Sequence, residues 1–220
     1  MTISILARDE KSGTVGGAAM TGNLCVGAWV LRADPTRGIT ASQGFAPSTL
    51  WGEAALSRLG DAPPADVIDD VVKTDAGRAW RQLGALDMQG RGAAFTGARN
   101  IAVSDHTVQP GLVICGNLLL DETVVASAAD AFVAHSGPFP ERLLAALKGA
   151  LAAGGDSRGT QSAALKIVGP KTPPLDLRVD YGERPLDDLA ALLQRTAAPD
   201  YAKWLSTLPT AHRPENAPSG

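Results

Sequence analysis

The spacing of apolar residues in this chain switches between two periods, and the order of the switches limits the fold. Alternating, extended segments come in blocks, and segments with apolar residues three and four positions apart come in pairs between the blocks. A doubly wound parallel sheet needs strands and helices that alternate strictly, which this order excludes. The pattern therefore predicts an α+β fold, a four-layer αββα sandwich of two antiparallel sheets flanked by helices.

The first block opens with a predicted β-hairpin. Its strands are residues 2–8 and 14–20, joined by the turn sequence at 9–13. The second strand is rich in Gly and Ala, and such strands usually persist because another part of the chain packs closely over their backbone. Two further strands, 25–31 and 38–44, complete an expected meander of four strands.

Glycines, prolines and the same two periods predict the remaining elements. The expected helices are 48–59, 65–76, 124–132, 143–151, 185–195 and 200–208, and the expected strands are 79–86, 93–96, 100–107, 111–115, 161–168 and 175–181. No repeat or low-complexity linker divides the chain. Residues 1–208 are therefore predicted to form a single domain, and residues 209–220 a disordered tail.

Composition argues against several classes of partner. The 20 basic and 23 acidic residues give a net charge of −3, and the basic residues are scattered, so nothing favours nucleic-acid binding. No apolar run approaches the roughly 18 residues that suggest a membrane-spanning helix, and no basic-then-apolar segment opens the chain. A cytoplasmic protein with no membrane partner is expected.

Thr2 is the first candidate for chemistry. Removal of Met1, which a small second residue usually permits, would leave Thr2 with a hydroxyl and a free α-amine. A threonine hydroxyl is too weak an acid to attack an amide unaided, but an α-amine with a pKa of about 7.7–8.0 can take its proton. Thr2 would then be a nucleophile that carries its own base. The alternative is an ordinary second residue without a role.

The densest polar cluster is the segment 154–162, between a predicted helix end and a strand start. Its glycines let the backbone turn sharply, and Asp156 and Arg158 could pair with each other or present a charge to a ligand. A Walker-type loop is excluded because Gly159 is not followed by Lys and Ser or Thr. Two structures remain possible for this segment, a capped turn and the edge of a pocket.

Two side-chain amides are further candidates. Asn117 follows Cys115 and Gly116, where a strand is expected to hand over to a helix. It could donate to a developing oxyanion, which contributes about 3–4 kcal/mol, or it could cap the helix. Gln43 ends a predicted strand, and it could hold substrate or face solvent.

Other catalytic arrangements are poorly supported by the sequence. The three histidines, at 106, 135 and 212, are far apart and lack metal-ligand spacing, so neither a metal nor another cofactor is expected. Cys25 and Cys115 are too few for a disulfide framework, and both are expected to be small buried residues. A thiol nucleophile at Cys115 is a remote alternative.

With these residues in view, the chain resembles the family known as domain of unknown function 1028, which is grouped with the Ntn (N-terminal nucleophile) hydrolases. The resemblance runs from Thr2 to about Arg195 and is most specific at 2–9 and 154–165. Weaker support comes from Ala41-Ser42-Gln43, Ala94-Phe95-Thr96-Gly97 and Gly116-Asn117-Leu118-Leu119. The resemblance implies a proteasome-type αββα sandwich with Thr2 in the place of the nucleophile, at the start of a central strand.

The expected function is hydrolysis of a small amide or N-acylated compound. The Thr2 hydroxyl would attack the carbonyl carbon, the Thr2 amine would act as base and then as acid, and water would release the acyl group. Thr2 and Asn117 are the expected catalytic residues, and the expected substrate contacts are Gln43, Asp156, Arg158 and Gln161. A small-molecule substrate and further copies of the chain are the expected partners. The alternative function is a non-catalytic domain of the same fold that binds a small molecule or a protein.

Overall fold

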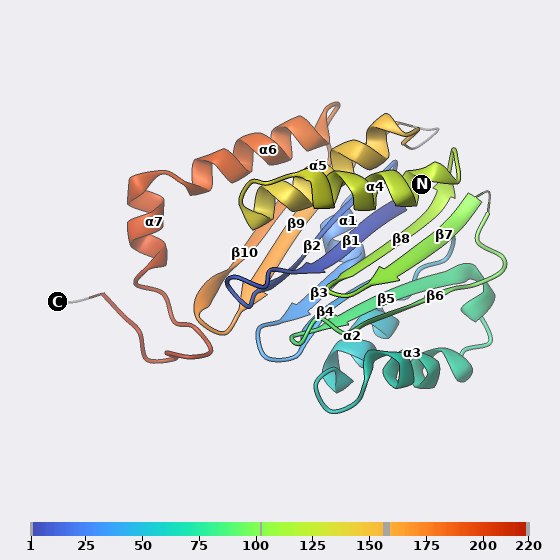
Figure 1. The fold of residues 1–220 in the computed structure, drawn as a ribbon, viewed down its shortest axis with the longest axis horizontal. Coiled ribbons are helices and arrows are strands. Elements are labelled where there is room, and N and C mark those ends of the chain that lie inside the picture. The colour runs from blue at the N-terminus through green and yellow to red at the C-terminus, as the bar shows by residue number, and fades with distance from the viewer. Residues whose placement is uncertain (1, 102, 156–158, 219–220) are drawn as a thin grey trace.

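The computed structural model describes residues 2–101, 103–155 and 159–218 (Figure 1). Within these ranges, ten strands form two antiparallel sheets, so the α+β class is confirmed. The strands are β1 (Thr2–Arg8), β2 (Val15–Thr21), β3 (Leu31–Asp34), β4 (Gly38–Gly44), β5 (Arg81–Asp87), β6 (Gly92–Thr96), β7 (Val103–Gln109), β8 (Leu112–Leu119), β9 (Ser162–Gly169) and β10 (Thr172–Val179). The helices are α1 (Val26–Trp29), α2 (Thr49–Arg58), α3 (Pro64–Lys73), α4 (Thr123–Ala134), α5 (Phe139–Ala152), α6 (Pro185–Thr196) and α7 (Pro199–Leu205), with a 3₁₀ turn at Arg78–Trp80.

Strand β1 lies in the middle of the larger sheet, whose order is β10-β9-β2-β1-β8-β7. The expected hairpin is confirmed, since β1 pairs with β2, and β8 flanks β1 on its other side. Ile3 and Ile5 point toward the helices, whereas Leu6 packs toward the second sheet. The first strand of the chain is therefore buried on both faces.

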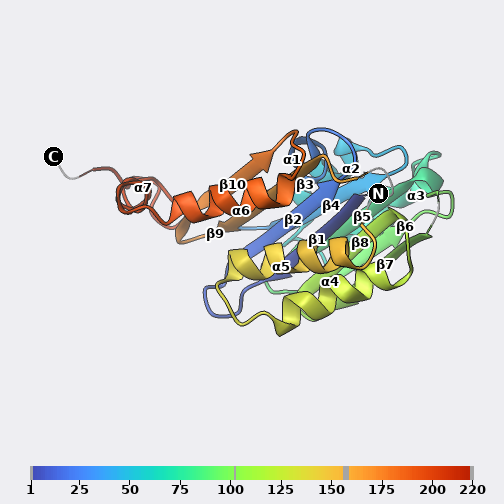
Figure 2. The same cartoon turned by 90° about the horizontal axis from the view of Figure 1, so that it is seen from above.

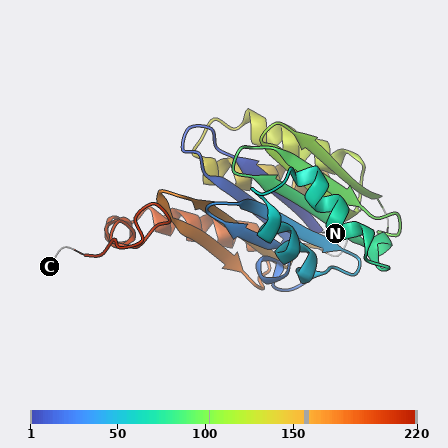
Figure 3. The same cartoon turned by 90° about the horizontal axis from the view of Figure 1, so that it is seen from below.

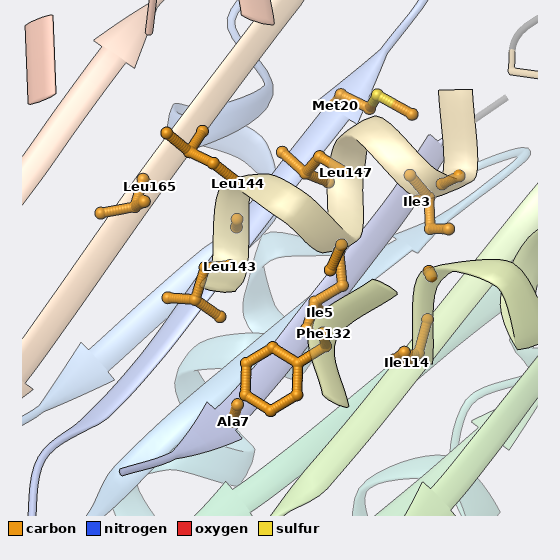
Figure 4. Packing of buried hydrophobic residues seen from close by; sticks show 14 of the residues in the cluster. Ile3, Ile5, Ala7, Met20, Ile114, Phe132, Leu143, Leu144, Leu147 and Leu165 are labelled. Atoms are coloured by element: carbon orange, nitrogen blue, oxygen red, sulfur yellow. The ribbon is translucent and has the colours of Figure 1, made fainter. Parts of the chain in front are cut away.

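Helices α4, α5 and α6 pack on the outer face of the six-stranded sheet (Figure 2). Ile3 and Ile5 of β1 meet Phe132 of α4 and Leu143 and Leu147 of α5 in one apolar cluster (Figure 4). Full burial of a side chain of this size stabilises a fold by about 1.5–3 kcal/mol. This cluster fixes which face of β1 turns toward the helices.

The four-stranded sheet, β3-β4-β5-β6, packs against the opposite face of the larger sheet. Leu6, Ile39, Leu86 and Val113 belong to the buried cluster between the sheets. Helices α2 and α3 cover the outer face of the smaller sheet (Figure 3), where Trp51 of α2 is buried in a third cluster. None of the described helices is long and apolar enough to cross a bilayer.

The predicted strand at 25–31 is wrong. Val26–Trp29 is the short helix α1, and β3 begins only at Leu31. The β-branched residues favour a strand locally, but the main-chain N–H of Val26 donates to Ser162 Oγ at 3.1 Å, far along the sequence. Gly27 fits against β9, where an added Cβ would lie 2.8 Å from Ala164 Cβ. Tertiary contacts therefore override strand propensity. The other three expected strands do not form one meander, because β1 and β2 belong to the larger sheet and β4 to the smaller one.

The expected change from strand to helix at Asn117 is also wrong, because β8 continues to Leu119. Helix α4 begins at Thr123 with Glu122 at its N-cap, so Asn117 caps no helix. The solvent-facing alternative for Gln43 is wrong as well, since this side chain is buried. The other predicted elements are confirmed, with ends shifted by a few residues.

The small residues of β2 have close neighbours, as predicted. An added Cβ at Gly16 would lie 2.8 Å from Ile167 Cγ1 and 2.9 Å from Phe139 Cε1. At Gly17 it would lie 2.9 Å from Ile39 Cδ1. The absence of side chains lets α5 and the second sheet approach opposite faces of β2.

We expect Gly16→Ala to lower the free energy of unfolding by about 1–3 kcal/mol, because the new methyl group overpacks this contact. Gly52→Ala in α2 is the matched control, since its added Cβ would come no closer than 3.4 Å to Arg32 Cγ. Removing a helical glycine should raise stability by up to about 1 kcal/mol. Urea denaturation measures both, and equal effects at the two positions would contradict the packing.

Candidate functional site

A row of four polar side chains crosses the six-stranded sheet at the first residue of β1. Thr2 pairs with Asn117 on β8 and with Thr21 on β2, and Thr21 pairs with Ser162 on β9. Paired residues on neighbouring strands place their side chains on the same face. Thr2 and Leu6 are an even number of residues apart on β1, so their side chains lie on the same face of the sheet. Leu6 packs between the two sheets, so the row faces the second sheet.

A second polar row faces the first from the smaller sheet. Gln43 of β4 pairs with Gln82 of β5, and Gln82 pairs with Thr96 of β6. Both glutamine side chains are buried. The Thr96 hydroxyl lies 2.8 Å from His106 Nδ1, which links this row to β7 at the edge of the larger sheet. Hydroxyls and amides thus replace the apolar core at this end of the two sheets.

The Thr2 side chain is half-buried at the centre of the first row. Its Oγ1 lies 3.0 Å from Thr21 Oγ1, so one hydroxyl donates to the other. The main-chain carbonyl of Thr2 accepts a hydrogen bond from Gln43 Nε2 at 3.2 Å. These two contacts hold both the side chain and the main chain of Thr2 in place.

Gln82, which the sequence analysis missed, connects the two rows. Its Oε1 accepts from Gln43 Nε2 at 2.7 Å and from Asn117 Nδ2 at 3.2 Å. Its Nε2 lies 2.8 Å from Thr96 Oγ1 and 3.0 Å from each of two main-chain carbonyl oxygens. A carbonyl oxygen can only accept a hydrogen bond, so the Gln82 nitrogen must face the two main-chain carbonyls and the Gln82 oxygen must face the other way. That oxygen in turn accepts from the nitrogens of Gln43 and Asn117, which fixes the orientation of their amides.

Two acceptor atoms are left over by this arrangement. Gln43 Oε1 and Asn117 Oδ1 are buried and lack a hydrogen-bond partner among the described residues. An unsatisfied buried polar group costs about 1–3 kcal/mol, so these atoms suit a donor brought to the site. Asn117 Nδ2 carries two hydrogens, one of which Gln82 Oε1 accepts. The Asn117 side chain thus offers both acceptor and donor capacity next to β1.

The remaining predicted site residues fall in or near the segment 154–162. The main-chain N–H of Gln161 donates to the carbonyl of Thr21 at 2.9 Å, which brings Gln161 next to the first row. Asp156 and Arg158 lie outside the described residues. Residues 155–159 also have the Gly-x-Ser-x-Gly spacing of a nucleophile elbow, but they follow a helix and precede a strand, the reverse of that motif.

Helix α1 forms a wall beside the first row. Ser162 Oγ donates to the carbonyl of Asn23 at 2.7 Å and accepts from the N–H of Val26 at 3.1 Å. A cavity of about 450 Å³ opens there, lined by Thr21, Asn23, Leu24, Val26, Trp29, Val30 and Pro47. A cavity of about 680 Å³ between α5 and α6 contains none of the row residues. The cavity beside α1 has one lining residue, Thr21, whose hydroxyl contacts the Thr2 hydroxyl.

Cys115 is a poor nucleophile in this environment. Its side chain is buried beside Gln43, whose Nε2 donates to the Cys115 carbonyl at 3.1 Å. Burial, with a smaller contribution from the charge of Asp105, raises the pKa of the thiol to about 12. A buried thiol that stays protonated near neutral pH does not attack a substrate.

No group of three or more His, Cys, Asp or Glu side chains within the described ranges is arranged to hold a metal ion.

Comparisons with known proteins identify the chain's relatives. The model of the family described as "Family of unknown function (DUF1028)" matches residues 2–189. A crystal structure of protein SPO2555 from Silicibacter pomeroyi, assigned to the same family model, is similar, with 43% sequence identity and a TM-score of 0.95. The match covers 100% of this chain and 96% of that chain. No curated protein matches.

Replacing Gln82 tests how much the amide network contributes to the free energy of unfolding. We expect Gln82→Met to lower the free energy of unfolding by about 2–4 kcal/mol, because buried donors and acceptors lose their partner. Gln89→Met is the control, since the Gln89 side chain is exposed, and it should stay within about 0.5 kcal/mol. Equal unfolding midpoints in urea would contradict the network.

Alkylation tests the state of the two thiols. With iodoacetamide at about pH 8, we expect the partly exposed Cys25 to react in the folded protein and the buried Cys115 to stay unmodified. In urea both should react. Peptide mass spectrometry measures each site, and rapid modification of native Cys115 would restore the thiol alternative.

Proposed function

This chain belongs to the DUF1028 family, and we propose that it is an N-terminal nucleophile amidohydrolase that cleaves a small amide or N-acyl bond. The observation that carries the proposal is the position of Thr2. It is the first residue of the central strand, with its hydroxyl 3.0 Å from a second hydroxyl and its neighbours held by buried amides. The arrangement of helices outside two packed antiparallel sheets supports the Ntn-type four-layer sandwich.

The proposed reaction begins once Met1 is removed. The Thr2 amine takes the proton of the Thr2 hydroxyl as Oγ1 attacks the carbonyl carbon of the substrate. Thr21 Oγ1, which contacts Thr2 Oγ1, orients the hydroxyl. The tetrahedral intermediate collapses to an ester on Thr2, and the protonated amine gives its proton to the departing nitrogen. Water then hydrolyses the ester and restores the hydroxyl.

Asn117 is proposed to stabilise both charged groups that form in this reaction, the oxyanion and the protonated amine. The Asn117 Nδ2 hydrogen that Gln82 does not accept would donate to the developing oxyanion, which is worth about 3–4 kcal/mol. Its unpartnered Oδ1 would accept from the Thr2 amine across the β1–β8 pairing. Gln43 would hold the main chain of Thr2 in place. Gln161 would border the substrate on the β9 side.

The first test is the state of the N-terminus. We expect the intact mass of the protein from its native cell to show that Met1 is absent and that Thr2 is the first residue. The amine acts as base only when it is free, so a chain with an uncleaved extension before Met1 should be inactive although it keeps the hydroxyl. Complete retention of Met1 would overturn the mechanism and favour the non-catalytic binding domain.

The second test uses release of p-nitroaniline from a series of N-acyl p-nitroanilides. We expect Thr2→Ala to lower kcat/KM by at least about a thousandfold, and Thr2→Ser to keep measurable activity. Ser4→Ala is the matched control, because this buried hydroxyl has no hydrogen-bond partner among the described residues. Full activity of Thr2→Ala would refute Thr2 as nucleophile, whereas loss in Ser4→Ala would indicate a general defect.

A further inference from the structure

The cavity beside α1 is separated from the candidate nucleophile by one residue, Thr21. Thr21 lines the cavity, and its Oγ1 lies 3.0 Å from Thr2 Oγ1. The volume of about 450 Å³ falls within the roughly 300–1,000 Å³ of small-molecule sites. A group bound in this cavity would therefore be held close to the Thr2 hydroxyl.

Hydrogen bonds within the chain hold the wall of this cavity in place. Cys25, in a left-handed conformation with φ 60°, starts α1 and donates its N–H to the carbonyl of Asp180 at 3.0 Å. Ser162 bridges Asn23 and Val26 through its hydroxyl. These bonds hold α1 against β9, so a ligand would not have to order the helix.

The lining is apolar and uncharged. Leu24, Val26, Trp29, Val30 and Pro47 supply its surface, and its polar members are the neutral Thr21 and Asn23. Trp29 is 55% exposed and Leu24 is 49% exposed, so both leave apolar surface open to a ligand in this cavity. A charged group would lose hydration here without gaining an opposite charge, whereas an aliphatic or aromatic group would cover exposed apolar surface.

We infer that this cavity binds the acyl side of the substrate and that the acyl group is apolar and uncharged, with Trp29 as the principal contact. The inference rests on the proposed function of Thr2, because it places the scissile carbonyl at the Thr2 hydroxyl. Charged parts of a substrate would then lie on the leaving-group side. On this inference the substrates are amides of apolar carboxylic acids.

Binding can be measured without turnover in the Thr2→Ala chain. The probes are the N-methylamides of acetic, butanoic and hexanoic acid, titrated by calorimetry. We expect each added methylene to lower Kd about threefold until the cavity is filled. The monoamide of adipic acid, which ends in a carboxylate, should bind at least about tenfold more weakly than the hexanoic amide.

Trp29→Ala, made in the Thr2→Ala chain, should raise the Kd of the hexanoic amide at least about fivefold. It should also reduce the differences in Kd between the three amides. Trp204→Ala is the control, because Trp204 is 52% exposed on α7 and does not line the cavity. It should leave the Kd unchanged. Both variants should unfold at the same urea concentration as their parent, which separates lost binding from lost folding.

The outcomes distinguish this inference from the proposed function. Affinity that does not depend on chain length, equal binding of the carboxylate probe, or unchanged binding in Trp29→Ala would overturn the apolar subsite, even if cleavage depends on Thr2. Binding that depends on chain length and on Trp29 supports the subsite. If the processed wild-type chain then cleaves none of the corresponding anilides, the hydrolase proposal fails while the subsite remains.

Discussion

The side-chain amide of Gln82 joins the two sheets at the end where the apolar core gives way to polar groups. It accepts from Gln43 and Asn117 and donates to main-chain carbonyls of the larger sheet. An amide shielded from water is stable only when such bonds are made, so few orientations are open to it. The position of the candidate nucleophile depends on this bond pattern, because the amide that binds the Thr2 carbonyl is itself oriented by Gln82.

The apolar clusters set the register on which the polar rows depend. Ile3 and Ile5 fill the helix side of β1 and Leu6 fills the inter-sheet side. A slip of one residue would turn every one of these side chains to the wrong face and would carry Thr2 away from Gln43. Apolar burial therefore specifies which face Thr2 occupies, and the amide network specifies its position on that face.

Local patterns were sufficient for the hairpin of β1 and β2 and therefore for the pairing of Thr2 with Thr21. They were insufficient where distant residues decide the structure. Helix α1 lies in a segment with two valines, Val26 and Val30, and the N–H of Val26 donates to the Ser162 hydroxyl of β9. Gln82 lies near the start of a predicted strand, between Arg81 and Leu83, and nothing in that local sequence marks it as buried. The meeting of Thr2, Gln43 and Asn117 required the packing of two sheets, which a single sequence does not specify.

The side chains next to Thr2 carry no full charge, and this affects whether the Thr2 amine can act as the proposed base. The side chains around Thr2 are hydroxyls and amides, which provide fixed dipoles without a full charge. A carboxylate at this place would stabilise the ammonium form of the Thr2 amine and raise its pKa, so that it could no longer accept a proton near neutral pH. Neutral amides can thus hold the proposed amine and oxyanion in turn without adding a charge that would favour the ammonium form.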